Sequence, residues 1–444
     1  MKRFPLFSKT LMIGLLTLLL LIPLGMIESK ISERKYLQTQ VQQDIARSAS
    51  GPQTMAGPYL VIHYKVRERT TRLDEKGQEK IFVSEAGPYE TVIAPHKLDI
   101  EGSADVEARN RGIYQARLYN LRSRVSGRFD VPVGYGIGKP IDDIIPQAAY
   151  LVVNVSDSRG IRNAPALTLN GHKLEFAPGS IKPLAGNGMH VPLETLTAQV
   201  EHHFDFSFPL DLQGMSTLAI NPSGNQTVMT LKSSWPHPSF GGSYLPRQRQ
   251  IDDTGFSASW LVTNLARNNT TQSGATTPAG GDQFSVEFID PINVYLLSER
   301  AVKYGVMFVV LIFTAFFMFE VLKNLRIHPM QYLLVGLAMA MFFLLIISLS
   351  EHIPFWVAYV ASGAACVALI GVYLAGVLGN RKPAMAFSGS IALLYAVLYG
   401  VLQSEDNALL MGTVLMFMAL AGVMVLTRKM DWYRLSEPAD TQAV

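Results

Sequence analysis

The stretch that decides the fold is AVKYGVMFVVLIFTAFFMFEVL, residues 301–322, because it is long and apolar enough to cross a lipid bilayer. A helix needs about 20 predominantly apolar residues to cross a hydrocarbon core about 30 Å thick. The charged side chains of this segment, Lys303 and Glu320, lie near its two ends, where they can reach water or lipid headgroups. The sequence therefore predicts a transmembrane helix over 301–322.

Five other segments have the same character, one near the start of the chain and four after residue 322. We expect transmembrane helices over 11–27, 331–350, 354–379, 384–403 and 407–427. The first of these resembles a signal peptide, but no A-x-A cleavage site follows it, so we interpret it as an uncleaved anchor. Leu37, Val41 and Ile45 continue at helical spacing, which predicts that this helix extends beyond the membrane over 28–49.

The short loops between these segments predict the orientation of the chain. Cationic side chains follow the second, fourth and sixth segments, and they are Lys323, Arg326, Arg381, Lys382, Arg428, Lys429 and Arg434. The alternate loops contain Glu351-His352 and Glu405-Asp406, without Lys or Arg. Because cytoplasmic loops carry the excess of Lys and Arg, we expect the termini 1–10 and 428–444 in the cytoplasm. Residues 28–300 then lie outside the membrane, which in a bacterium is the periplasm.

Composition excludes several classes of function. Only 16% of the 444 residues are charged, against about 25% in an average soluble protein, which agrees with a membrane protein. The net charge of +3 is too small to indicate a nucleic-acid partner. The single cysteine, Cys366, lies in an apolar run, so disulfides and cysteine-based zinc sites are excluded.

The segment 28–300 is rich in short apolar runs separated by Gly, Pro, Asn and Asp, which is typical of β-strands and turns. We expect its last part, 284–300, to form a pair of strands that returns the chain to the membrane. The predicted fold is an α+β membrane protein. It has six transmembrane α-helices and one large β-rich periplasmic domain inserted between helices 1 and 2.

The clearest strand is EHHFDFSF, residues 201–208. Alternation places Phe204, Phe206 and Phe208 on one face, which we expect to lie in the core. The opposite face carries Glu201, His203 and Asp205, with Ser207 beside them. Such a set is found both in metal sites and on ordinary solvated strand faces. We interpret it as a solvated face and assign no metal and no cofactor to the chain.

A second distinctive stretch is SSWPHPSFGGSYLP, residues 233–246. Its prolines exclude a helix and favour extended backbone, and we expect the chain to turn at Gly241-Gly242. Trp235, Phe240 and Tyr244 are expected to anchor the stretch on a sheet. His237 has no acid or nucleophile within the motif, which argues against catalysis. The candidate residues of this structural or partner-binding motif are Trp235, Pro236, His237, Pro238 and Phe240.

Other motifs also admit an ordinary structural interpretation. SDSRG, residues 156–160, is either a turn in which Asp157 bonds its own backbone or an anion site using Arg159. GYGIGKP, residues 134–140, lacks the spacing of a phosphate-binding loop and is expected to be a turn. Within the membrane, the candidate polar residues are Lys303 and Glu320. Glu320 is either a functional group or an interfacial partner of Lys323, and we prefer the second interpretation.

Several longer runs resemble one protein family throughout the chain. These runs are SGPQ (50–53), SDSRGI (156–161), SSWPHPSFGGSYLP (233–246), ERAVKYG (299–305), HPMQYLLVGLA (328–338), LSEH (349–352) and LTRKMDWY (426–433). In this order they resemble the CreD family of bacterial inner-membrane proteins. The resemblance implies a role in envelope integrity, often under a Cre-type two-component system. It implies no catalytic residues, because none is established for that family.

Three functions are compatible with these features. The first is a non-enzymatic membrane platform that presents a periplasmic β-rich domain to envelope partners, which are envelope proteins or cell-wall or lipid components. The second is a transporter or channel accessory for an amphipathic envelope component. The third is an envelope-modifying enzyme based on His237, His203 and nearby acids. The lipid bilayer is an expected partner in each case, and a homo-oligomer is possible, whereas nucleic acid is not an expected partner.

Overall fold

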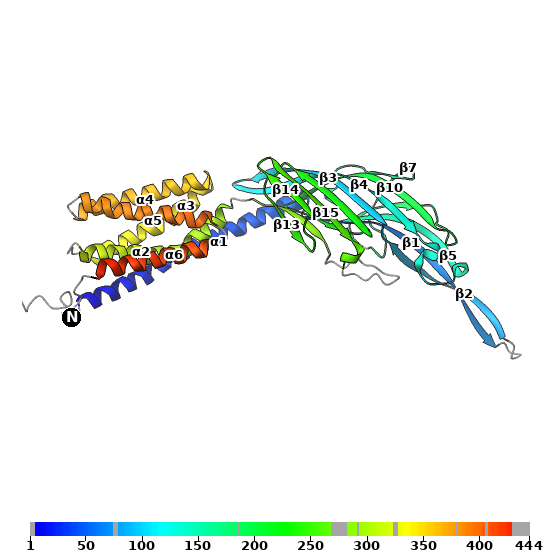
Figure 1. Cartoon of the computed structure of the whole chain (residues 1–444), viewed down its shortest axis with the longest axis horizontal. Helices are drawn as coiled ribbons and strands as arrows, with labels where there is room; N and C mark the ends of the chain where they lie inside the picture. The colour runs from blue at the N-terminus through cyan, green and yellow to red at the C-terminus, as the bar shows by residue number, and fades with distance from the viewer. Residues whose placement is uncertain are drawn as a thin grey trace, which may run out of the picture. The chain divides into compact units, whose positions relative to one another are not determined.

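The computed structural model describes residues 5–73, 79–184, 186–267, 282–290, 293–322, 327–378, 381–404 and 407–428. The chain divides into two units (Figure 1). One unit is helical and comprises Met1–Thr39 and Ile292–Val444. The other comprises Gln40–Pro291 and is built mainly of β-strands.

The helices of the described chain confirm the six predicted membrane segments. They are α1 (Pro5–Ser48), α2 (Val294–Leu322), α3 (Pro329–Ser350), α4 (Phe355–Leu378), α5 (Arg381–Gln403) and α6 (Ala408–Thr427). All 6 are long and apolar enough to cross a membrane. The expected extension of the first helix is also confirmed, because α1 is one continuous helix of 44 residues (Figure 1).

The helical unit is held together by close packing of small and aromatic side chains. A Cβ atom at Gly336 of α3 would lie 2.2 Å from Cδ1 of Leu20, so only glycine allows α1 to approach this closely. The ring of Phe316 in α2 lies 4.6 Å from that of Tyr332 in α3 and 4.9 Å from that of Phe387 in α5. These contacts bring α1, α3 and α5 around α2.

The described residues of the β unit form two eight-stranded sheets. In spatial order the first has β13 (Pro238–Gly242), β16 (Phe284–Phe288), β11 (Thr217–Asn221), β1 (Gln53–Leu73), β5 (Ile144–Val155), β9 (Gly188–Leu193) and β8 (Ala177–Pro178), with β2 (Glu79–Ile93) paired to β1. The second has β14 (Gln248–Asp252), β15 (Gly255–Thr263), β12 (Gln226–Ser233), β3 (Lys97–Arg111), β4 (Tyr114–Val131), β10 (His202–Met215), β6 (Ala166–Leu169) and β7 (His172–Glu175). Most pairs are antiparallel, but β1–β11 and β12–β3 are parallel.

Four short 3-10 helices connect these strands. They are η1 (Val133–Gly136), η2 (Ile141–Asp143), η3 (Ser158–Gly160) and η4 (Asn264–Ala266). The first contains the start of GYGIGKP, where Gly134, Tyr135 and Gly136 all have positive φ. The predicted turn at this motif is therefore confirmed, since successive positive φ values reverse the chain.

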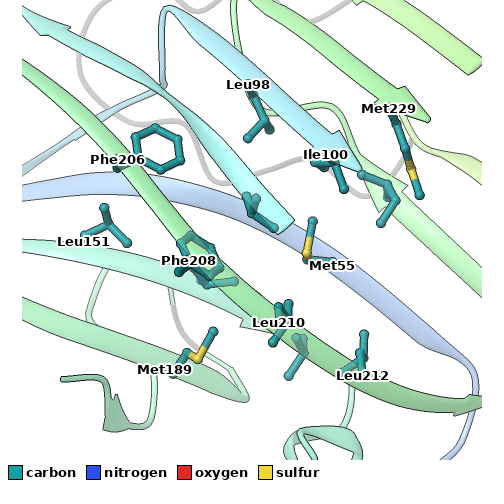
Figure 2. Packing of buried hydrophobic residues seen from close by; sticks show 14 of the residues in the cluster. Met55, Leu98, Ile100, Leu151, Met189, Phe206, Phe208, Leu210, Leu212 and Met229 are labelled. Carbon is teal, nitrogen blue, oxygen red and sulfur yellow. The ribbon is translucent and has the colours of Figure 1, made fainter. Parts of the chain in front are cut away.

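One hydrophobic core lies between the two sheets, and Figure 2 shows part of it. Phe206 and Phe208 of β10 are buried beside Leu151 of β5, as the alternation of residues 201–208 predicts. Phe204 is only partly buried and packs against the same core at its margin. The phenylalanine face of β10 is thus the core face.

Two sequence-based expectations need correction. The segment 284–300 is not a strand pair, because β16 ends at Phe288 and α2 begins at Val294. The side chain of Asn293 accepts hydrogen bonds from the backbone N–H groups of Tyr295 (3.1 Å) and Leu296 (3.3 Å), and this cap starts the helix despite the β-forming residues that follow. The turn expected at Gly241-Gly242 is not found there, because both glycines pair with β16 as part of a strand. Pro238–Gly242 forms β13, an edge strand, where proline is tolerated.

Candidate functional site

Among the described residues of the helical unit, the most buried charged group is Glu320, near the C-terminal end of α2. Its side chain is only 4% exposed and forms an ion pair with Lys9 of α1. The same carboxylate accepts hydrogen bonds from the Tyr332 hydroxyl at 2.8 Å and from the backbone N–H of Ile327 at 2.9 Å. An isolated charge is costly in hydrocarbon, but this one is satisfied by three donors from three parts of the chain.

The structure shows a partner of Glu320 that the sequence did not suggest, namely Lys9. Lys323, the partner that the sequence suggests, lies outside the described residues. Sequence proximity favoured Lys323, whereas the contact with Lys9 depends on how α1 packs on α2. The sequence did contain an indication of this contact. A carboxylate in an apolar segment requires a cation, and Lys9 precedes the first of the apolar segments.

Lys303, the other intramembrane candidate, does not contact Glu320. It lies near the opposite end of α2, is 60% exposed, and pairs with Glu299 one turn earlier at 2.8 Å. Glu299 also contacts Lys35 of α1 at 3.1 Å. Lys303 therefore belongs to an exposed network at the end of the helix, not to a polar path through the bundle.

A second nearly buried carboxylate belongs to Glu351, which follows α3. Its side chain is 9% exposed and lies 3.5 Å from Arg34 of α1, and it accepts a hydrogen bond from the Tyr295 hydroxyl at 3.2 Å. Together with the pair at Glu320, this contact ties α1 to the other helices near both ends of α2 and α3. The charged residues of the bundle thus act as clamps on α1.

In the β unit, Trp235 is fixed by specific contacts. Its indole N–H donates to the carbonyl of Ile289 at 3.0 Å, and its backbone N–H donates to the Ser233 hydroxyl at 3.2 Å. The guanidinium of Arg117 lies 4.9 Å from the ring centroid and pairs with Asp290 at 3.0 Å. A cation over an indole ring is favourable, so Trp235 joins β12 to the segment that follows β16.

The remaining residues of the motif divide into packed and exposed groups. Phe240 of β13 meets Phe256 and Trp260 edge to face, each at 5.7 Å, and so enters the core as expected. His237 is exposed between Pro236 and Pro238, with its ring 6.0 Å from that of Trp235. Its carbonyl accepts a hydrogen bond from Ile289 at 3.2 Å. The contacts described for His237 are structural.

The polar face of β10 is a set of ion pairs. Arg128 donates two hydrogen bonds to Asp205, at 2.7 and 3.1 Å, and holds the pKa of that carboxyl below its usual value. His203 Nδ1 lies 2.7 Å from Asp130, while its Nε2 is 3.9 Å from Glu201. Among the described residues no three or more His, Cys, Asp or Glu side chains are placed to hold a metal ion.

The SDSRG motif forms a turn that caps α1. Asp157 accepts hydrogen bonds from the backbone N–H of Arg159 at 3.1 Å and from its guanidinium at 2.6 and 2.9 Å. These bonds lower the pKa of Asp157. The guanidinium also donates to the carbonyl of Arg47 at 2.5 Å, in the last turn of α1. The turn interpretation is confirmed, and Arg159 serves a helix end that lacks intrahelical donors.

The SGPQ run meets this turn. Gln53 is buried, donates to the carbonyl of Asp157 at 2.8 Å and accepts from its backbone N–H at 3.2 Å. Gly160 leaves room for this side chain, because a Cβ atom there would lie 2.2 Å from Gln53 Nε2. The Ser50 hydroxyl donates to the carbonyl of Gln213 in β10 at 2.6 Å. These residues fix the end of α1 to the β unit.

The β1–β2 hairpin extends beyond the rest of its sheet (Figure 1). Pairing of β1 with β5 ends at Val66, whereas its pairing with β2 continues to Leu73. We call the outer part, Arg67–Leu73 with Glu79–Glu85, the arm. It exposes three consecutive apolar side chains, Ile81 (63%), Phe82 (48%) and Val83 (60%). This surface was not predictable from the sequence, because an apolar run in a strand usually indicates burial.

A family model described as "Inner membrane protein CreD" matches residues 5–433. The chain belongs to the CreD family. The inner membrane protein CreD of Escherichia coli (strain K12) is 36% identical to it over 445 residues, covering 99% of this chain and 96% of that protein. The resemblance seen in the sequence is confirmed, and with it the assignment to the inner membrane.

Two solved structures are distantly similar to this CreD-family chain. An M1 zinc metallopeptidase from Deinococcus radiodurans has a TM-score of 0.21 and 7% identity, covering 44% of this chain and 42% of that one. A mutant two-domain M1 zinc metallopeptidase bound to L-arginine has a TM-score of 0.20 and 9% identity, covering 44% of this chain and 42% of that one. Scores at this level carry no inference about fold or activity.

Proposed function

We propose that this CreD-family protein supports cell-envelope integrity as a non-enzymatic membrane platform. In this proposal the six helices anchor the chain in the inner membrane, with both termini in the cytoplasm. Residues 28–300 then lie in the periplasm, and the arm contacts a protein of the envelope. The distribution of Lys and Arg among the loops supports the orientation.

The observation that carries the proposal is the exposed apolar run on the arm. A two-stranded hairpin without further packing is marginally stable in water, so its apolar side chains gain little from folding of this chain alone. Ile81 and Val83 point to one face of the ribbon and Phe82 to the other. The hairpin is held at its base by ion pairs of Arg69 with Asp143 and Lys65 with Glu85, both at 3.0 Å. Exposed apolar groups on such a fixed projection indicate an interaction surface.

A polypeptide fits this surface better than a lipid does. In the described part of the chain β2 pairs only with β1, so its outer edge presents backbone donors and acceptors. An added strand can pair with these groups while its side chains cover Ile81, Phe82 and Val83. A lipid would cover the side chains but leave the backbone edge without partners.

Complementation of a deletion strain tests this function. A strain that lacks the gene, challenged with detergent or a β-lactam, receives the wild type or the double variant Ile81→Ser/Val83→Ser. The matched control is Ile251→Ser/Leu261→Ser, which replaces two exposed apolar side chains of β14 and β15 (46% and 38% exposed). We expect the arm variant to fail and the control to complement, at equal protein level and membrane insertion. Full complementation by the arm variant would refute the role of the arm.

A further inference from the structure

A pocket of about 380 Å³ lies in the β unit where the end of α1 packs on β4. Its floor is apolar and includes Ile45 of α1 and Leu118 of β4. Leu118 points away from the core between the sheets, since it alternates along β4 with Tyr119 and Leu121, which belong to that core. The pocket is thus separate from the main core and opens on the outer face of the second sheet.

The polar lining of this pocket is cationic. Arg109 and Arg111, from the end of β3, and Arg162, from the loop after η3, all line it. Asn110 and Gln213 also line the pocket, and among the described residues no Asp or Glu is part of the lining. Three arginine residues line one small volume, and their charges would attract an anion into it.

The acids near these arginines do not enter the pocket. Arg109 donates to Glu107 at 3.0 and 3.1 Å, and Arg111 lies 3.5 Å from Asp44. Neither acid lines the pocket. The guanidinium of Arg162 has no hydrogen-bond or ion-pair partner among the described residues, since only its backbone N–H is bonded.

Two other polar pockets on the second sheet differ in charge. One places Arg128 and Lys97 beside their own partners Asp205 and Asp99, which line it as well. The other includes Glu101 together with Arg122 and Lys232. Both contain carboxylates that compensate their cations, whereas the pocket at the end of α1 contains none.

We propose that the pocket at the end of α1 binds a phosphate group. Guanidinium groups present paired N–H donors whose planar geometry matches phosphate oxygens, and three arginines line this pocket. The volume is sufficient for a phosphate with a small organic substituent, which the apolar floor accommodates. A phospholipid headgroup and a soluble phosphate ester share this chemistry. The site is independent of the arm.

Ligand binding to the full chain in non-ionic detergent tests the proposal. Because the ligand would bind only the folded protein, saturating inorganic phosphate should raise Tm above that in chloride at equal ionic strength. Loss of a charge-assisted hydrogen bond should weaken phosphate binding in Arg162→Gln about tenfold or more, measured by calorimetry. Arg109→Gln should weaken it similarly. The matched control is Arg122→Gln, an exposed arginine of the same sheet that also has one carboxylate partner, Asp105.

Comparison of ligands distinguishes the two sources of phosphate. Tighter binding of soluble dihexanoyl phosphatidylglycerol than of inorganic phosphate, with the same loss in Arg162→Gln, identifies a lipid headgroup. Equal or tighter binding of inorganic phosphate identifies a soluble ester. If either Arg162→Gln or Arg109→Gln fails to fold, phosphate binding by the other variant tests the proposal. The proposal is overturned if neither ligand raises Tm above chloride, if the folded pocket variants bind like the wild type, or if Arg122→Gln weakens binding equally.

Discussion

Removal of the Glu320 carboxylate should destabilise the helical unit more than any exposed charge in the bundle. In the structure this group joins three elements: Lys9 of α1, the backbone of Ile327 before α3, and Tyr332 within α3. Glu320→Ala removes all three contacts at once. Glu320→Gln retains an oxygen that can accept from Tyr332 or Ile327 but removes the negative charge.

The size of the expected loss of stability follows from the hydrogen-bond donors that lose the Glu320 carboxylate as their acceptor. Each buried donor without an acceptor costs about 1–3 kcal/mol, and this applies to the Tyr332 hydroxyl and the Ile327 N–H. Lys9 is 26% exposed and can turn toward water, so its loss of a partner adds about 0–1 kcal/mol. We therefore expect Glu320→Ala to lower the free energy of unfolding by about 2–7 kcal/mol, a range that contains the roughly 3–5 kcal/mol of other broken buried pairs. Glu320→Gln should cost about 1–2 kcal/mol.

Unfolding of the purified full chain in detergent, followed by helical circular dichroism, measures these changes. The control is Lys303→Ala, which removes a 60% exposed i,i+4 pair and should cost only about 0.5 kcal/mol or less. A Glu320→Ala variant as stable as this control would refute the claim that Glu320 holds α1 against the other helices. If stability and insertion were unchanged but envelope resistance were lost, the carboxylate would instead act in transport.

Three further predictions concern the β unit and the orientation of the chain. Trp235→Ala should lower the free energy of unfolding by about 2–3 kcal/mol, because packing of the half-buried indole and its hydrogen bond are lost. His237→Ala should change this free energy by less than about 0.5 kcal/mol. Thermal unfolding of the two variants measures the difference. The pKa of Asp157 is held below its usual 3.8 by the hydrogen-bonded guanidinium beside it. The Asp157 carboxylate therefore contributes its full stabilisation of the fold above pH 3.8, and this contribution is lost as the pH falls below 3.8. Asp157→Asn should therefore lose less stability than the wild type as the pH falls below 3.8, and parallel pH profiles would contradict this. In cells, a membrane-impermeant maleimide should label Ser158→Cys but not Arg381→Cys, and labelling of both from one side would overturn the orientation.

The helices were predictable because their signal is local. A run of about 20 apolar residues specifies a membrane helix wherever it occurs, and all six segments proved to be helical. The boundary at α2 was not predictable from propensity, since Tyr295 and Leu296 are compatible with a strand. A cap from Asn293 decided it, and caps depend on side-chain geometry that apolar patterning does not reveal.

The β unit was predictable in class but not in topology. Alternation identified Phe206 and Phe208 as core residues, yet it gave no indication that β1 pairs in parallel with β11 across more than 150 residues. Pairing between distant strands depends on the whole core, not on local pattern. The arm was missed for the same reason. Ile81–Val83 has the apolar pattern of a buried strand, and only the pairing of distant strands shows that no other strand covers it in the described part of the chain.

Photo-crosslinking from the arm in living cells tests the platform function most directly. A photoreactive phenylalanine analogue replaces Phe82, which is 48% exposed, and the control carries it at Ile251 of β14, which is 46% exposed. We predict that the Phe82 position yields a discrete adduct with a periplasmic or membrane-anchored protein, that the control does not, and that Ile81→Ser/Val83→Ser removes the adduct. A functional protein that yields no adduct at Phe82 beyond the control, or one with lipid alone, would contradict the proposed platform.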